Sequence, residues 1–345
     1  MEKLKNILKK IKYYRVICIL LALIFAITGL VESIVIKNGT EKYPDQTVAK
    51  RWDPNGKFSH ISYFIKQSEN FTPIDVERTC YELKSDIEAK LVSTSKENLS
   101  DVSTNMIVSY MGKSYITLEN EGKYVSVDCY AVGGDFFFFH PVRLVNGTYF
   151  SSDDLMHDGI ILDENTAWQL FGSNDIVGQQ VYYGEKILFV KGVYDRPDDK
   201  IHRFAMGSAP EIFVPIELLN SDELPMAITC FELCLPNPID NFAKNLMAEK
   251  NIVSEQGGEM IENSKRFEPD NLLAVLKEKK YRSLKDRDII YPYWEKIARY
   301  EEEKLALPSL VRQVTLTLAA VIIIGLILYE ITKHTKLKSR NDDNA

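Results

Sequence analysis

The stretch "GGDFFFFHPVRLVNGTYFSSDD", residues 133–154, places four consecutive phenylalanines between a Gly-Gly pair and an Asn-Gly pair. Successive side chains of a strand point to opposite faces, so a strand through Phe136–Phe139 would present aromatic bulk on both faces. The alternative is that only part of the run is strand. In either case the run predicts dense core packing, and a ligand-facing aromatic patch is the competing interpretation.

The composition around this run limits the class of protein. The chain has 345 residues, of which 45% are hydrophobic, enough for one to three packed domains. Its net charge of -7 is uneven: residues 37–309 hold 31 Lys and Arg against 44 Asp and Glu, whereas the two ends together hold 11 against 5. An acidic middle between basic ends argues against nucleic acid as a partner.

Two long apolar segments flank the middle. Val16–Val31 is uncharged, and a helix over residues 13–36 would be ~36 Å long, enough to cross a bilayer. The second uncharged segment, Val314–Tyr329, predicts a membrane helix over residues 310–330 in which Arg312 reaches the interface. A cleaved signal peptide is the alternative for the first segment, although no A-x-A site follows it. A buried soluble helix is the alternative for the second.

The charges beside these segments predict their orientation. Lysines and Arg15 precede the first segment and basic residues follow the second, so both ends are expected in the cytoplasm and residues 37–309 outside. The first twelve residues also predict an amphipathic helix, with an apolar face suited to partner docking. That face consists of Leu4, Ile7, Leu8 and Ile11. A basic flank that only sets topology is the alternative.

The middle of the chain predicts an α+β fold. "SHISYFIK" reads as a strand, and Thr72-Pro73 precedes a segment with helical apolar spacing. "ENTAWQLF" predicts a helix that ends at Gly172, and "VYYGEKILFVKGVY" predicts a hairpin turning at Gly184-Glu185. Strands alternate with helices at both ends of this region while its centre is mostly strand, which suggests an α/β subdomain interrupted by a β-rich insert.

No catalytic, cofactor or metal site is predicted. Gly112-Lys113-Ser114 matches the tail of a phosphate-binding loop, but Ile107 occupies the position of its first glycine. The histidines are scattered, and the paired aspartates Asp153-Asp154 and Asp198-Asp199 lie in polar turns. Cys230 and Cys234 would be ~13 Å apart on one face of a strand, too far for a disulfide. The chain is therefore not expected to be an enzyme.

Several motifs occur in the order found in one known family. The opening stretch is followed by "IILDENTAWQLFG", "IVGQQVYYG" and "FVKGVYD". With them the chain resembles the extracytoplasmic core domain of MacB/FtsX-type ABC transporter permeases, most specifically over residues 123–217. The resemblance implies a porter-like α/β subdomain interrupted by a sabre-like β-rich insert, with the phenylalanines at the junction of two small cores.

The resulting domain prediction combines this resemblance with the two membrane helices. It comprises a cytoplasmic helix (1–12), a membrane helix (13–36), the first porter-like part (37–132), the sabre-like insert (133–220), the second porter-like part (221–290), a stalk helix (291–309), a membrane helix (310–330) and a cytoplasmic tail (331–345).

The resemblance also carries a functional expectation. Permeases of this family usually have three further helices after the outer domain, and this sequence has only one there. A two-span, non-catalytic subunit is therefore expected, in an oligomeric complex with a separate ABC ATPase and a fuller permease. Tyr291, Tyr293 and Trp294 are candidates for the stalk or the membrane interface. The alternative is a stand-alone membrane-anchored binding or sensing domain.

Overall fold

The computed structural model of the chain describes residues 2–94, 105–151, 153–221, 223–250, 252, 257–282 and 288–342. The helices are α1 (Glu2–Glu41), α2 (Val48–Trp52), α3 (Pro73–Thr94), α4 (Phe136–Phe139), α5 (Glu164–Phe171), α6 (Lys200–Met206), α7 (Ile216–Leu219), α8 (Phe242–Glu249), α9 (Pro269–Arg282) and α10 (Tyr293–Asp342). The strands are β1 (Phe58–Ile65), β2 (Ile107–Asn120), β3 (Lys123–Gly134), β4 (Arg143–Gly147), β5 (Gly159–Asp163), β6 (Gln180–Tyr183), β7 (Lys186–Asp195), β8 (Glu211–Pro215), β9 (Cys230–Pro236) and β10 (Gly258–Glu262). Three short 3-10 turns, η1 (Pro44–Gln46), η2 (Gln67–Glu69) and η3 (Asn263–Lys265), complete the described elements.

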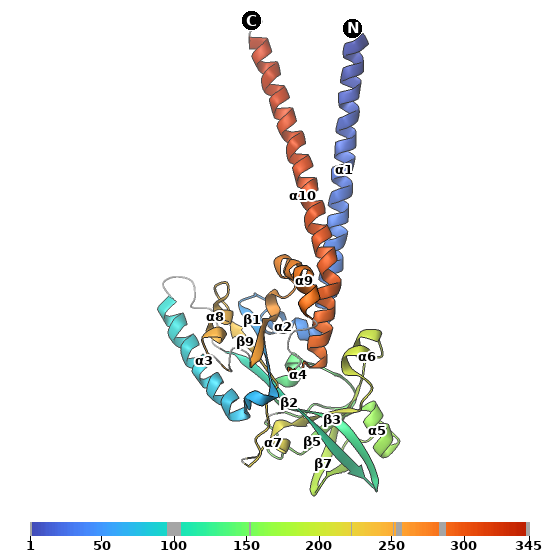
Figure 1. Cartoon of the computed structure of the whole chain (residues 1–345), viewed down its shortest axis with the longest axis vertical. Coiled ribbons are helices and arrows are strands. Elements are labelled where there is room, and N and C mark those ends of the chain that lie inside the picture. The colour runs from blue at the N-terminus through green and yellow to red at the C-terminus, as the bar shows by residue number, and fades with distance from the viewer. Residues whose placement is uncertain are drawn as a thin grey trace. The chain divides into compact units, whose positions relative to one another are not determined.

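The described strands form one mixed sheet (Figure 1). Its strand order is β10-β1-β9-β2-β3-β8-β5-β7-β4, and β6 pairs with β2 and β7. Most neighbours are antiparallel, while β3 with β8 and β5 with β7 are parallel. The long β2–β3 hairpin lies between β1, β9 and β10 on one side and β8, β5, β7 and β4 on the other. This mixed sheet with its helices confirms the predicted α+β class. The predicted β6–β7 hairpin is also confirmed, with Tyr183 paired to Lys186 across Gly184-Glu185.

Each face of the sheet has its own core. On β9, Phe231, Leu233 and Leu235 enter one cluster with residues of α3 and α8. The alternate residue Cys230 enters a second cluster with Trp294 of α10. Because strand side chains alternate, a continuous buried run such as β9 must supply both clusters.

The phenylalanine run forms the single helical turn α4 rather than a strand. Gly134 has a φ of 67°, which ends β3, and the backbone carbonyl of Asp135 then accepts hydrogen bonds from the amides of Phe138 and Phe139. Phe136 and Phe139 are buried at 2% and 0% exposure, and they belong to two different clusters. The run therefore packs two apolar clusters from one turn, as the prediction of core packing required.

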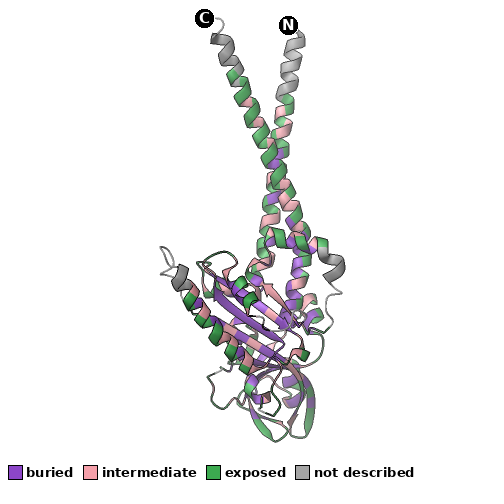
Figure 2. Cartoon of the chain, turned by 60° about the vertical axis from the view of Figure 1, so that its left-hand side comes forward, coloured by how far each residue is buried: buried purple, intermediate pink, exposed green. Residues whose placement is uncertain are grey.

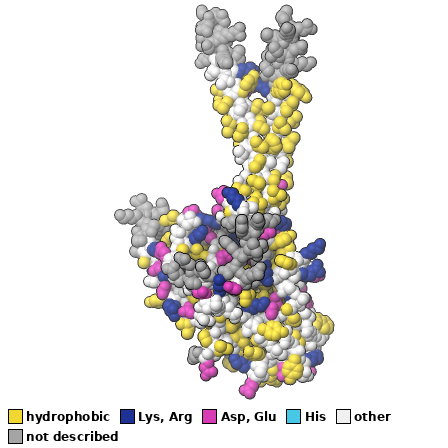
Figure 3. All heavy atoms as spheres, viewed as in Figure 1, with side chains coloured by type: hydrophobic (Ala, Val, Ile, Leu, Met, Phe, Trp, Pro, Cys, Tyr) yellow, Lys and Arg dark blue, Asp and Glu magenta, His cyan; other side chains and the backbone are white. Residues whose placement is uncertain are grey.

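The described residues divide into two compact units. One comprises Tyr43–Phe267 and Lys280–Tyr300 and contains the sheet. The other comprises Met1–Lys42, Glu268–Lys279 and Glu301–Ala345. Two helical segments, Tyr13–Glu41 and Tyr293–Lys333, are long and apolar enough to cross a membrane, and hydrophobic side chains cover much of their visible surface (Figure 3).

Candidate functional site

A buried carboxylate on β9 is the centre of the site. Glu232 lies between Phe231 and Leu233, whose side chains enter the cluster beneath α3 and α8, so the alternation of the strand turns Glu232 toward the opposite face. It is only 1% exposed. A buried carboxylate needs charged or hydrogen-bonding partners, because transfer of a charge out of water is costly.

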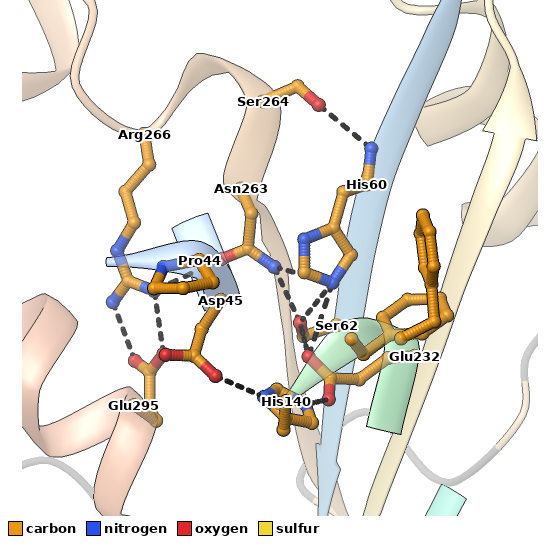
Figure 4. A network of polar contacts seen from close by, with 12 residues as sticks. Pro44, Asp45, His60, Ser62, His140, Glu232, Asn263, Ser264, Arg266 and Glu295 are labelled. Atoms are coloured by element: carbon orange, nitrogen blue, oxygen red, sulfur yellow. Dashed lines mark hydrogen bonds and ion pairs between the residues drawn. The ribbon is translucent and has the colours of Figure 1, made fainter. Parts of the chain in front are cut away.

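Glu232 has three partners. Ser62, directly opposite on β1, donates its hydroxyl hydrogen to Oε1 at 2.5 Å. His60 Nε2 lies 3.2 Å from the same oxygen, and His140 Nε2 bonds Oε2 (Figure 4). Burial by itself would raise the pKa of Glu232, but the charge of His140 and the hydrogen bonds from both histidines hold it well below its usual range.

His140 is held between two carboxylates. It follows α4, is fully buried, and contacts Asp45 Oδ1 through Nδ1 at 2.7 Å, while Nε2 faces Glu232. Burial alone would lower the pKa of His140, but Glu232 and Asp45 outweigh it and raise the pKa to about 9. The ring is therefore an imidazolium at neutral pH, with both nitrogens donating.

Trp294 covers the face of this imidazolium. The two rings are stacked, with centroids 3.8 Å apart and planes inclined by 24°. A cation over an indole face is attracted by the ring quadrupole, and the attraction is stronger where water is excluded. Trp294 lies in the first turn of α10, so this contact joins the β9 carboxylate to the start of that helix.

A second arm of the network reaches α10 by another route. The amide of Asn263 donates to Ser62 Oγ at 2.5 Å, and its carbonyl oxygen accepts from Arg266. Arg266 makes a bidentate pair with Glu295, at 2.6 and 2.7 Å, and both side chains are buried (Figure 4). Bidentate guanidinium–carboxylate pairs combine charge with a fixed geometry, so they orient the elements that carry them.

The pair extends along α10. Arg299, one turn further, donates through Nε to Glu295 at 2.6 Å and through Nη2 to Glu259 of β10 at 2.7 Å. Tyr291 packs against the Arg299 guanidinium, with 4.1 Å between the guanidinium carbon and the ring centroid. The first two turns of α10 are thus held by ion pairs to Glu259 of β10 and to Arg266 beside η3, and by the stacking of Trp294 on His140.

A separate charged cluster joins the strands of the central region. Arg196 donates to Asp163 at 3.3 Å and to the backbone carbonyls of Gly207 and Ala209, and it lies 3.6 Å from Glu211. Burial raises the pKa of Glu211 to about 7, although Arg196 and Lys113 act in the opposite direction. This cluster orients β5 and β8 and the loop before α6.

Neither cluster presents a nucleophile with an adjacent base open to substrate. Among the described residues, no group of three His, Cys, Asp or Glu side chains is arranged to hold a metal ion. The arrangement is instead suited to mechanical attachment, because each buried charge has an opposite charge from a different segment of the chain.

The candidate aromatic residues lie in or against the second core cluster. Tyr293 and Trp294 are 7% and 2% exposed within the second core cluster, and Tyr291 packs against that cluster. The backbone of the candidate docking residues Leu4, Ile7, Leu8 and Ile11 belongs to α1, but their side chains lie outside the described residues. Lys113 of the Gly-Lys-Ser sequence lies on β2 and pairs with Asp128 at 2.8 Å.

Sequence reasoning missed the histidine–glutamate network. His60, His140 and Glu232 are 80 to 172 residues apart, and the histidines alone show no motif spacing. One signal was available: a glutamate inside the continuous apolar strand "CFELCL" must be buried and must have a partner. His60 and Ser62 on β1 can be recognised as its partners only once the pairing of β1 with β9 is known.

Several known proteins are similar to this chain. The family model described as MacB-like periplasmic core domain matches residues 17–233. The structure is similar to the periplasmic region of MacB from Actinobacillus actinomycetemcomitans, at 15% identity and a TM-score of 0.42, covering 65% of this chain and 92% of that one. It is also similar to the extracellular domain of the noncanonic ABC-type transporter YknZ from Gram-positive bacteria, at 15% identity and a TM-score of 0.39, covering 59% and 99%.

A third similar structure is a domain of a putative permease protein from Porphyromonas gingivalis, at 12% identity and a TM-score of 0.34, covering 60% of this chain and 90% of that one. Among proteins with curated descriptions, none matches this sequence.

Proposed function

Because the chain belongs to the family of the MacB-like periplasmic core domain of ABC-type transporter permeases, we propose that it is a non-catalytic membrane subunit that couples a cytoplasmic ATPase to movement of its outer domain. In this proposal the ATPase is a separate chain, and a permease subunit with further membrane helices completes an oligomeric complex. Nucleotide chemistry occurs on the ATPase, and this chain transmits force.

The observation that supports the proposal is the attachment of α10. This helix continues without a break from Tyr293 to Asp342, and its first two turns carry Trp294, Glu295 and Arg299 of the buried network. A helix held at one end by desolvated ion pairs can transmit displacement or rotation, since the pairs resist changes in distance and orientation. Pro308 lies within the helix and does not end it.

The orientation of the chain is part of the proposal. Basic residues precede the first apolar helix and follow the second, and on this basis we assign Met1–Arg15 and the tail after Tyr329 to the cytoplasm. The apolar face of Leu4, Ile7, Leu8 and Ile11 is then the candidate surface for an inner partner.

Co-purification from native membranes tests the proposal. Mild detergent extraction and affinity capture of the full chain should recover an ABC ATPase and a permease in fixed ratio, and the ratio should persist through size-exclusion chromatography. Capture of the intact chain alone, under conditions that preserve a known ABC complex from the same membranes, would instead favour a stand-alone sensing domain.

A further inference from the structure

The two apolar helices share a repeating pattern of protected residues. On α1, buried or half-buried positions recur with alternating spacings of three and four residues: Arg15, Cys18, Ala22, Phe25, Gly29, Glu32, Ile36 and Gly39. On α10 the same alternation joins Leu305, Pro308, Arg312, Thr315, Ala319, Ile322 and Leu326, and Glu330 follows four residues later. Most intervening residues are exposed (Figure 2). A 3.5-residue repeat on both partners is the pattern of a left-handed two-helix seam.

Three contacts give the register of this seam. A Cβ added at Gly39 would lie 3.0 Å from Leu305, and one added at Gly29 would lie 2.5 Å from Leu316. Near the other end Arg15 pairs with Glu330 and packs over the ring of Tyr329. The α10 number falls as the α1 number rises, so the helices are antiparallel in one continuous register. The two glycines permit a close approach that a larger side chain would prevent.

The same register places Glu32 of α1 level with Arg312 of α10. Glu32 lies three residues beyond Gly29, and Arg312 lies three residues before Thr315, the other residue that a Cβ at Gly29 would meet. Both are half-buried seam positions. The structure shows no ion pair between these two side chains, but they lie level on facing helices, and we propose that in the bilayer they close into an outer ion pair that, with the inner pair Arg15–Glu330, fixes the register of α1 against α10.

The spacing of the charges supports this assignment. No charged residue occurs between Arg15 and Glu32 or between Arg312 and Glu330. Residues 16–31 are therefore ~24 Å long as a helix, close to the ~30 Å hydrocarbon thickness of a bilayer. The two pairs thus lie near the two membrane surfaces, where long charged side chains reach the head groups and pairing reduces the cost of desolvation.

The polarity of the pairs also selects the partner. On α1 the positive charge is at the inner end of the seam and the negative charge at the outer end, and on α10 the order is reversed. Two copies of α1 side by side in parallel would place Arg15 against Arg15 and Glu32 against Glu32. The seam therefore favours pairing within one chain over parallel self-association, as charged flanking positions do in coiled coils.

The ion pair does not depend on the proposed function. Its role in transmitting force, however, rests on the proposed function. If the chain transmits force from an ATPase, two register-locked helices would move together, and neither would slide along the other.

Cysteine cross-linking of the full chain tests the register. The experiment uses membranes without the proposed ABC partners and a Cys18→Ser background. Phe25→Cys and Ala319→Cys occupy facing seam positions. The exposed pair Leu23→Cys and Val321→Cys is the matched control at the same level. Oxidation should cross-link the seam pair rapidly and the control pair slowly.

Charge reversal then tests the outer ion pair. Glu32→Arg or Arg312→Glu alone should slow seam cross-linking by about fivefold, and the double exchange should restore it. Lys37→Glu, a charge reversal at an exposed position of α1, should leave the rate unchanged. If a reversed variant fails to insert, the milder Glu32→Gln and Arg312→Gln are compared singly with the native chain, and each should slow seam cross-linking.

The proposal is overturned if the single changes leave the seam rate unchanged, or if the double exchange is no faster than the singles. Because no ATPase is present, these outcomes are independent of whether the proposed function holds.

Discussion

Removal of the His140 side chain should destabilise the sheet-containing unit strongly. In His140→Leu, Asp45 can return to solvent because its side chain is 16% exposed, but Glu232, with a side chain only 2% exposed, cannot. Glu232 would keep the hydrogen bonds from Ser62 and His60 and lose the charge of His140, which contributes most to keeping it ionised. Breaking one side of a buried ion pair typically costs ~3–5 kcal/mol, which is the expected loss in the free energy of unfolding.

The pH dependence gives an independent measure of the same interaction. The folded pKa of His140, about 9, is above its ordinary 6.5, so its stabilising contribution is complete below pH 6.5 and is lost as pH rises through 9. That difference corresponds to about 3 kcal/mol. The native chain should lose this amount between pH 6.5 and 9.5, whereas His140→Leu should lack that part of the pH dependence.

Equilibrium denaturation of the full chain in detergent measures both effects. Trp294, stacked on His140, is a fluorescent reporter of the site. A matched control is the double variant His140→Leu with Glu232→Leu, which removes both charges and should cost clearly less than the two single losses added together, because no buried carboxylate remains unpaired. Two results would show that His140 and Glu232 are not an ion pair. One is a loss in the free energy of unfolding below ~1 kcal/mol in His140→Leu, and the other is a loss in the double variant equal to the sum of the two single losses.

Three further outcomes are expected. Alanine at either buried phenylalanine, Phe136 or Phe139, should lower the free energy of unfolding by ~3–5 kcal/mol, and alanine at the other two should cost less; equally small losses at all four would indicate an exposed ligand-facing patch. A cysteine at the exposed Asp198 should react with a membrane-impermeant label added outside intact cells, and a C-terminal tag should stay protected; an accessible tag would contradict the two-span orientation. Leu8→Asp with Ile11→Asp should reduce recovery of the ABC partners while insertion and folding survive; the same change in protease pattern in membranes without those partners would assign the helix to the lipid surface instead.

Much of the architecture follows from short-range pattern. The helix "ENTAWQLF" begins at the N-cap Asp163, whose carboxylate accepts from the amide of Thr166, and it ends at Gly172 in the left-handed region, as the sequence predicts. The two apolar helices and the β6–β7 hairpin are equally local, because helical rise, strand alternation and turn preference act over a few residues. The α+β class and the family resemblance rest on such segments and are confirmed.

The phenylalanine run shows where local pattern becomes insufficient. Sequence predicts that Phe136–Phe139 is buried, but a strand and a helical turn both satisfy that requirement. The helical turn is selected because β3 ends at Gly134 and two apolar clusters lie on different sides of α4.

The candidate site was decided by tertiary structure alone. His60 meets Glu232 only because β9 lies beside β1, and His140 reaches the same carboxylate only because α4 packs against β2, the other neighbour of β9. Arg266 meets Glu295 only because η3 lies beside the start of α10. The sequence by itself required that a glutamate within "CFELCL" find a partner, since an isolated buried charge is too costly to survive. Which of the chain's distant cations supplies that partner depends on strand order, and strand order is set by the packing of the whole domain.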